Sequence, residues 1–170
     1  MFDDVVLPHL DAAFNYARWL TRNDADAEDV VQDACVRAVR YFQSLRHDDA
    51  RAWLLTIVRN VWYSRISRRS EAAETTGWDS TLDDRPDGTP DPEVLLLQQR
   101  TAARVHAAIA QLPADFREVI VLREIEGLSY KEIAAVVQVP VGTVMSRLAR
   151  ARERLSAMLT AQAPPIGRIS

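Results

Sequence analysis

The sequence predicts an all-α protein whose two small helical domains are joined by a flexible acidic linker. Three observations lead to this prediction. Apolar residues recur at the three-to-four-residue spacing of amphipathic helices over most of the 170 residues. Between residues 71 and 92 that spacing stops, and three prolines, two glycines and seven acids take its place. Charge divides the chain in the same way, because residues 51–70 carry five arginines and no acid, while residues 146–170 carry five arginines and one acid.

These patterns set the domain boundaries. We expect a helical domain over residues 1–70, an acidic linker over 71–92, a second helical domain over 93–162 and a disordered tail over 163–170. Fully extended, the linker would reach roughly 70 Å at about 3.3 Å per residue, so the two domains could lie far apart.

Three helices are expected in the first domain. The first begins at Val6 and ends at the polar turn Thr21 to Asp24, and the second follows an acidic start that suits a helix N-terminus. The third runs from Arg51 to Ser70 behind a cap at Asp48 or Asp49. The apolar stripes of the three are Val6, Leu10, Ala13, Phe14, Ala17 and Leu20; Ala27, Val30, Val31, Ala34, Cys35, Ala38, Val39, Phe42 and Leu45; and Leu54, Ile57, Val58, Val61 and Ile66.

The second domain is predicted to begin with two helices, over Val94 to Ile109 and from Pro113 to Gly127. The apolar face of the latter consists of Phe116, Val119, Ile120, Leu122 and Ile125.

A helix-turn-helix follows. Ser129 and Glu132 form the S-x-x-E pattern of a capping box, and Gln138 to Val141 interrupt this helix before a longer one begins. The longer helix has an apolar side of Val144, Leu148, Ala151 and Leu155, and a polar side of Thr143, Ser146, Arg147, Arg150, Arg152 and Arg154. Such a helix suits the major groove of DNA, where hydroxyls reach phosphates and arginine reaches guanine edges. The alternative is a surface hairpin with a solvated arginine face.

The third helix of the first domain carries a second candidate binding face. Its polar and aromatic residues recur at helical spacing and are Thr56, Arg59, Asn60, Tyr63 and Ser67. Arginines can follow phosphates while aromatic rings stack on unpaired bases, so this face favours single-stranded nucleic acid. For the flanking Trp53 and Trp62, ordinary core packing is the alternative.

With these segments the chain resembles the extracytoplasmic-function subgroup of bacterial RNA polymerase sigma factors over nearly its whole length. Asp26 to Ala34 looks like the family's core-polymerase-binding helix, Arg51 to Asn60 like its −10 helix, and Pro140 to Arg147 like its −35 recognition helix. The resemblance implies a stress-response factor that binds core RNA polymerase, recognises duplex DNA at −35 and a single strand at −10, and promotes melting. It also implies an anti-sigma factor as a partner, and a free protein that polymerase binding spreads open.

The resemblance assigns candidate residues to each partner. The polymerase-binding set is Asp29, Gln32, Asp33 and Arg37. The −10 set is Leu45, Arg46, Thr56, Arg59, Asn60 and Tyr63. The −35 set is Thr143, Ser146, Arg147, Arg150 and Arg152. Because phosphates would repel the acidic second helix, a protein partner suits that helix better than DNA.

No catalytic residue, cofactor or metal site is expected. His9, His47 and His106 lie far apart in sequence, which gives an enzyme such as a small helical hydrolase little support. The acidic N-terminus, the single Cys35 and the lack of an apolar run of about 20 residues predict a cytoplasmic protein without membrane insertion. The nearest alternative function is a stand-alone helix-turn-helix regulator, which would bind duplex DNA tightly without polymerase.

Overall fold

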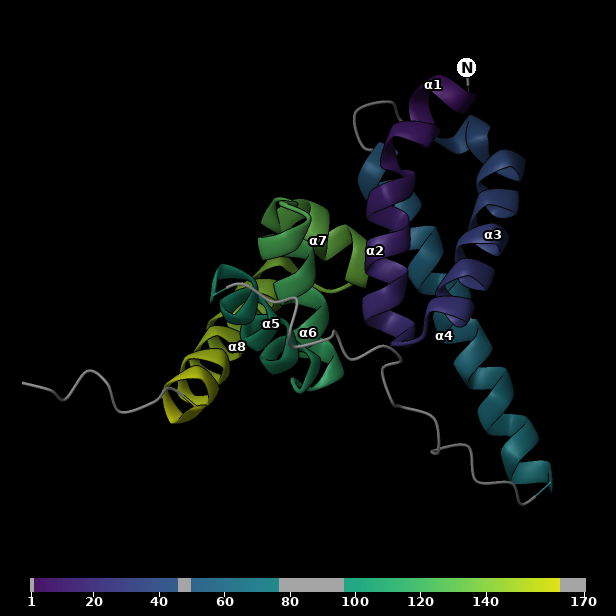
Figure 1. Ribbon diagram of the computed structural model, residues 1–170. Coiled ribbons are helices and arrows are strands. Elements are labelled where there is room, and N and C mark those ends of the chain that lie inside the picture. Colours follow the sequence, from purple (N-terminus) through teal and green to yellow (C-terminus); the bar gives the residue numbers. More distant parts are fainter. Residues whose placement is uncertain (1, 46–49, 77–96, 163–170) are drawn as a thin grey trace, which may run out of the picture.

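The computed structural model describes residues 2–45, 50–76 and 97–162, and every regular element in these ranges is helical, which confirms the all-α class (Figure 1). The N-terminal domain contains α1 (Phe2–Val6), η1 (Leu7–His9), α2 (Leu10–Thr21), α3 (Asp24–Arg40), η2 (Phe42–Ser44) and α4 (Ala50–Thr76). The C-terminal domain contains α5 (Leu97–Ala110), α6 (Ala114–Ile120), η5 (Val121–Ile125), α7 (Tyr130–Val137) and α8 (Val141–Gln162).

Helices α2, α3 and α4 pack on one another to form the N-terminal domain. Arg22 ends α2 in the left-handed conformation, with a φ of 60°, and the Asn23 side chain begins α3 by accepting a hydrogen bond from the Asp26 N–H at 3.0 Å. The buried residues of the three helices are Ala13, Tyr16, Ala17 and Leu20; Ala27, Val30, Ala34 and Ala38; and Ala50, Ala52, Leu54, Leu55, Val58, Val61 and Trp62. The buried side chains of α3 are all small, namely three alanines and one valine.

The structure corrects the predicted first helix and the predicted linker. A 3-10 turn over Leu7–His9 separates α1 from α2, because Pro8 lacks the N–H that a continuous helix would use. At the other end, α4 continues to Thr76, so the first part of the predicted linker is helical. Residues 77–96, the caps predicted at 48 and 49, and the predicted tail 163–170 lie outside the described residues.

In the N-terminal domain, two residues predicted to be buried are exposed. Val39 on α3 is 60% exposed and Ile66 on α4 is 37% exposed. Neighbouring helices cover these residues incompletely: α3 packs mainly on α2, α4 and η2, and the C-terminal half of α4 projects beyond the other helices (Figure 1). Cys35 is half-buried, and burial raises the pKa of its thiol.

The C-terminal domain confirms the predicted helix-turn-helix. The Ser129 hydroxyl accepts from the Glu132 N–H at 3.1 Å and the Glu132 carboxylate accepts from the Ser129 N–H at 2.8 Å, so both bonds of the capping box form. Gln138 ends α7 with a φ of 61°, and the chain bends by 100° before α8. On α8 the predicted apolar side faces inward, whereas Ile125 of the preceding helix is 37% exposed and does not join the predicted face.

The two domains lie in direct contact. α7 packs against α4, and α6 with η5 packs against α2 (Figure 1). α3 lies on the opposite side of the N-terminal domain, and α8 extends away from the contact. One cluster of buried apolar residues runs through both domains.

Candidate nucleic-acid interface

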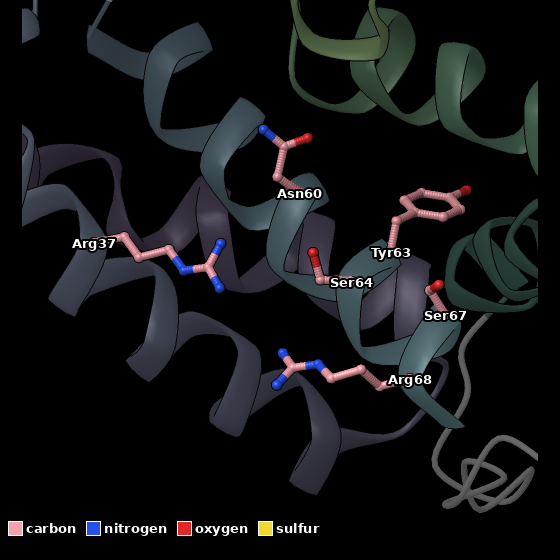
Figure 2. A pocket seen from close by; sticks show the side chains of 6 residues that line it. All are labelled: Arg37, Asn60, Tyr63, Ser64, Ser67 and Arg68. Carbon is pink, nitrogen blue, oxygen red and sulfur yellow. The ribbon is translucent and has the colours of Figure 1, made fainter. Parts of the chain in front are cut away.

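The polar face predicted on α4 is present, and it borders a hollow between α3 and α4. The hollow has a volume of about 710 Å³ and is lined by Arg37, Asn60, Tyr63, Ser64, Ser67 and Arg68. Figure 2 shows Arg37 and Arg68 extending into the space between the two helices, with Asn60 and Ser64 on the α4 wall. This hollow offers amide and hydroxyl groups beside two cations.

The two arginines of the hollow differ from their neighbours. Arg65 donates to Asp33 at 2.7 Å and Arg69 lies 3.6 Å from Asp26, so these two cations are paired across α3 and α4. Arg37 and Arg68 make no such pair with another described residue. Arg37 and Arg68 therefore bring to the hollow positive charge that no described carboxylate pairs with, which favours an anionic ligand there.

Three donors of the N-terminal domain converge on one carboxylate of the C-terminal domain. Glu118 on α6 accepts from the hydroxyl of Tyr16 at 2.7 Å, from the Nε of Arg59 at 2.7 Å and from the hydroxyl of Tyr63 at 2.6 Å. The Glu118 side chain is 4% exposed, and the Arg59 guanidinium lies 4.6 Å from the centre of the Tyr63 ring. We call these four residues the Glu118 cluster.

The Glu118 cluster keeps its tyrosines neutral. Burial and the adjacent Glu118 carboxylate raise the pKa of Tyr16 well above its ordinary value, and the same two causes raise the pKa of Tyr63. Both hydroxyls therefore remain hydrogen-bond donors. The sequence analysis did not single out Glu118 or Tyr16, although an acid directly followed by Val119, Ile120, Val121 and Leu122 was a signal that Glu118 is buried.

Further polar contacts join the domains. Arg51 donates to the carbonyl oxygen of Glu126 at 2.9 Å, and Asn15 donates to its carboxylate at 3.4 Å. The rings of Trp19 and His106 lie 5.3 Å apart. Burial raises the pKa of the Glu126 carboxyl against the opposing effects of Asn15 and Arg51.

The rest of the predicted −10 set is dispersed. The Thr56 hydroxyl donates to the carbonyl oxygen of Ala52 at 2.8 Å, and Leu45 lies half-buried at the end of η2. Arg46 falls outside the described residues. Trp62 is buried and Trp53 packs against the core, so both have a structural role.

A second hollow lies at the start of α8. Its volume is about 590 Å³ and its lining is Asp115, Phe116, Pro140, Gly142, Thr143, Ser146, Arg147 and Arg150. The structure thus brings together four residues of the predicted −35 set. The fifth, Arg152, lies apart and donates to Glu124 at 2.8 Å, while Arg147 lies 3.8 Å from Asp115.

The outer face of α3 presents the predicted polymerase-binding residues. Asp29, Gln32 and Asp33 are exposed, whereas Arg37 is half-buried and lines the α3–α4 hollow. The sequence analysis missed Val36, which is 61% exposed and lies one turn beyond Gln32 and Asp33. Exposed valine beside carboxylates is more typical of a protein-binding surface than of a DNA-binding one.

Neither a metal cluster nor a membrane span is found within the described part of the chain. No group of three or more histidine, cysteine, aspartate or glutamate residues there is placed to hold a metal ion. No single helix there has the length and apolarity to cross a membrane; α7 and α8 pass that test of length and composition only as a pair bent by 100°.

Comparison with known proteins identifies related sequences over both domains. The family model of sigma-70 region 2 matches residues 5–72, and that of sigma-70 region 4 matches residues 102–155. The chain is 35% identical over 154 residues to the ECF RNA polymerase sigma factor SigE of Mycolicibacterium smegmatis, covering 91% of this chain but only 60% of that longer protein. It is 36% identical over 137 residues to the ECF RNA polymerase sigma-E factor of Escherichia coli, covering 76% of this chain and 72% of the relative.

A solved structure resembles both domains together. The sigma factor RpoE from Bartonella quintana, in complex with the anti-sigma factor NepR, matches with a TM-score of 0.79 and 31% identity. The match covers 95% of this chain and 98% of the other.

Proposed function

Because this chain belongs to the extracytoplasmic-function family of RNA polymerase sigma factors, we propose that it binds core RNA polymerase and directs it to promoters through two DNA-binding faces. The observation that carries the proposal is a pair of arginine-lined hollows, one on each domain. The protein acts by binding and performs no covalent chemistry. Its place of action is the cytoplasm, where core polymerase and the chromosome are found.

The outer face of α3 is the proposed polymerase contact. Asp29 and Gln32 supply charge and hydrogen-bonding groups, Asp33 adds a carboxylate that is shared with Arg65 of α4, and the exposed Val36 supplies apolar surface. An acidic surface repels DNA and attracts a basic protein surface, so charge favours polymerase over promoter at this face. Arg37, the fourth residue of the predicted set, lines the α3–α4 hollow. We therefore propose that it also contacts single-stranded DNA.

The α4 face and its hollow form the proposed −10 site. Asn60 is exposed and offers both a donor and acceptors to a base edge, while Tyr63 offers a ring for stacking. Arg37 and Arg68 line the same hollow, where their charge suits the phosphates of a single strand. Each stacked base would contribute about 1–3 kcal/mol, and this binding energy stabilises the melted DNA. Leu45, Arg46, Thr56 and Arg59 complete the proposed set.

The start of α8 is the proposed −35 site. Thr143 and Ser146 are placed in the first turns of the helix, as phosphate contacts require, and Arg147 and Arg150 border the same hollow. Arg152 points to a different part of the surface, so we propose for it a peripheral backbone contact.

An anti-sigma factor is a further proposed partner. The support is the likeness to RpoE of Bartonella quintana, whose structure was determined with the anti-sigma factor NepR. The likeness spans both domains, so the proposed partner would bind a sigma factor in an arrangement similar to this one.

In vitro transcription with core polymerase tests the proposal. Core polymerase with this chain is expected to produce transcripts from discrete start sites on genomic DNA, and core polymerase alone is not. Asn60→Ala should lower open-complex formation with little change in affinity for core polymerase. Gln111→Ala, an exposed amide in the turn after α5, is the matched control.

The same purified components distinguish a sigma factor from the alternative function. A stand-alone helix-turn-helix regulator would bind a promoter duplex as tightly without polymerase as with it, in a gel-shift measurement. Equal affinity in the two conditions, with no new start sites, would contradict the sigma-factor proposal.

A further inference from the structure

The face proposed for the −10 strand is partly occupied by the chain itself. Arg59 and Tyr63 belong to that face, and both donate to Glu118 of the C-terminal domain. α7 also packs against α4 in the same arrangement, and Figure 2 shows Tyr63 turned toward the C-terminal domain. A hydroxyl or guanidinium that donates to Glu118 does not donate the same hydrogen to a nucleic acid.

The Glu118 carboxylate is chemically similar to the DNA phosphate for which it would substitute. A carboxylate presents two anionic oxygens, as a phosphodiester does, and both bind arginine and tyrosine hydroxyls through charge-assisted hydrogen bonds. The Arg59 guanidinium also lies against the Tyr63 ring, an arrangement that serves a bound strand equally well. A carboxylate that is 4% exposed and accepts three short bonds is a well-matched partner for these groups.

We propose that Glu118 is an intramolecular competitor for single-stranded promoter DNA, which holds the free chain closed and inactive without a second protein. The proposal rests on the −10 site proposed above. In the closed form the Glu118 cluster is satisfied within the chain. When the domains separate, the strand replaces Glu118 on Arg59 and Tyr63, and the freed carboxylate is hydrated.

The contact between the domains combines a shared apolar cluster with a set of hydrogen bonds. Four of these hydrogen bonds end on the Glu118 carboxylate, one on the Glu126 carbonyl oxygen and one on the Glu126 carboxylate. Such groups find water when the domains separate, so opening does not leave buried donors without partners. The open fraction of the chain then sets its apparent affinity for a strand, because only the open form exposes the complete site.

Tyr16 makes the proposal testable apart from DNA contact. It donates to Glu118 but belongs to α2 and is fully buried, outside the proposed −10 set. Tyr16→Phe removes one hydroxyl and keeps the ring, so it weakens the closed form and leaves the DNA-contacting residues intact. Tyr63→Phe, in contrast, removes a donor from both the closed form and the DNA site.

Energy transfer within the full-length chain measures closure directly. Dyes are attached at Gln43→Cys in η2 and Ala157→Cys in α8, both exposed positions, in a Cys35→Ala background. The closed-to-open ratio is expected to fall about 10-fold for Tyr16→Phe, which loses one hydrogen bond to a charge. For Glu118→Gln the fall is on the order of 100-fold, because a buried ion pair is broken. Glu124→Gln, which breaks the exposed pair with Arg152, is the matched control and leaves energy transfer unchanged.

Binding of a fluorescent single-stranded oligonucleotide that carries a mapped −10 sequence completes the test. Both variants are expected to bind it more tightly than the unaltered chain, in proportion to the gain in open fraction. Unchanged energy transfer in Tyr16→Phe and Glu118→Gln would overturn the proposal, as would opening without tighter binding. If Glu118→Gln does not fold, Tyr16→Phe decides alone.

Different results would refute the sigma-factor function and the competitor role of Glu118. Loss of energy transfer in the variants, with no transcription by the unaltered chain, refutes the function and retains an interdomain contact at Glu118. Normal transcription with unchanged energy transfer refutes only the role of Glu118.

Discussion

Arginine borders both proposed DNA faces, but its surroundings differ between the two domains. On α4 the Arg59 side chain is 17% exposed and is bound to Glu118, whereas Arg150 on α8 is exposed and makes no hydrogen bond or ion pair with another described residue. Arg59 of the single-strand face is thus bound to a group inside the chain, whereas Arg150 of the duplex face is not, although Arg147 beside it lies 3.8 Å from Asp115. Residue type alone therefore does not tell whether a nucleic-acid face is available; the partner of each cation does.

We call the α4 face with Arg59 and Tyr63, which Glu118 covers, the closed face, and the α8 face with Arg150 the open face. The largest expected effect comes from removing Arg59, the cation of the closed face. Arg59→Ala leaves the Glu118 carboxylate buried with only two tyrosine hydroxyls, so it should destabilise the closed form by about 3–5 kcal/mol. The same variant should bind the −10 strand less tightly when open, because a phosphate or base contact is lost. Chemical denaturation together with energy transfer between the domains would measure the first effect.

Arg40→Ala provides the control for this variant, because Arg40 is exposed on α3 and makes no ion pair with another described residue. A closed form as stable in Arg59→Ala as in Arg40→Ala would mean that the closed face is held by apolar packing and not by charge.

A smaller effect is expected on the open face. Arg150→Ala should weaken −35 recognition by about 1–3 kcal/mol if the guanidinium reads a base, and it should leave domain closure unchanged. Binding of the polymerase complex to matched and altered −35 duplexes measures this loss. An equal loss on every sequence would instead assign Arg150 to a phosphate. Arg154→Ala is the control, because Arg154 lies 5.1 Å from the Phe116 ring centre and does not line the hollow.

The fold of the open face gives a third prediction. Ser129→Ala removes one bond of the capping box and should destabilise the C-terminal domain by about 1 kcal/mol, without a direct effect on closure. Thermal unfolding measures the change, with the exposed Ser156→Ala on α8 as the control. A loss equal to that of the control would show that α7 is fixed by packing against α4 and not by its cap.

The sequence predicted the local structure of the open face well, for a physical reason. The bonds of Ser129 with Glu132 and the alternation of Val144 and Leu148 with arginines are encoded within a few residues. Each signal is satisfied by the helix in which it lies, so no knowledge of distant segments was needed to place α7, the turn and α8.

The closed face could not be predicted in the same way, because its partners lie far apart in the chain. Tyr16 and Glu118 are separated by 102 residues, and no periodicity connects them. The errors at Val39 and Ile66 have a related cause: spacing identifies an apolar stripe, but only the extent of neighbouring helices decides how much of it is covered. The assignment of individual residues to polymerase, strand and duplex remains a set of predictions.

Deprotonation of Tyr16 and Tyr63 should weaken closure only in alkali, which makes it the smallest effect under ordinary conditions. Tyr16 and Tyr63 have raised pKa values in the closed form, because burial and Glu118 oppose the phenolate. A group with a raised pKa contributes its full stability below its ordinary pKa, which for tyrosine is about 10, and loses it as the pH rises further. Arg59 stays protonated throughout this range and attracts a phenolate, which only partly offsets the repulsion by Glu118.

Energy transfer between the domains should therefore stay constant from about pH 7 to 9 and decrease above about pH 10, while circular dichroism still reports intact helices. Tyr16→Phe should retain a weaker alkaline transition, because Tyr63 remains bound to Glu118. If closure persists above the ordinary tyrosine pKa with the helices intact, the two hydroxyls do not hold the domains together, and the contrast between the closed and open faces must come from the pair of Arg59 with Glu118 alone.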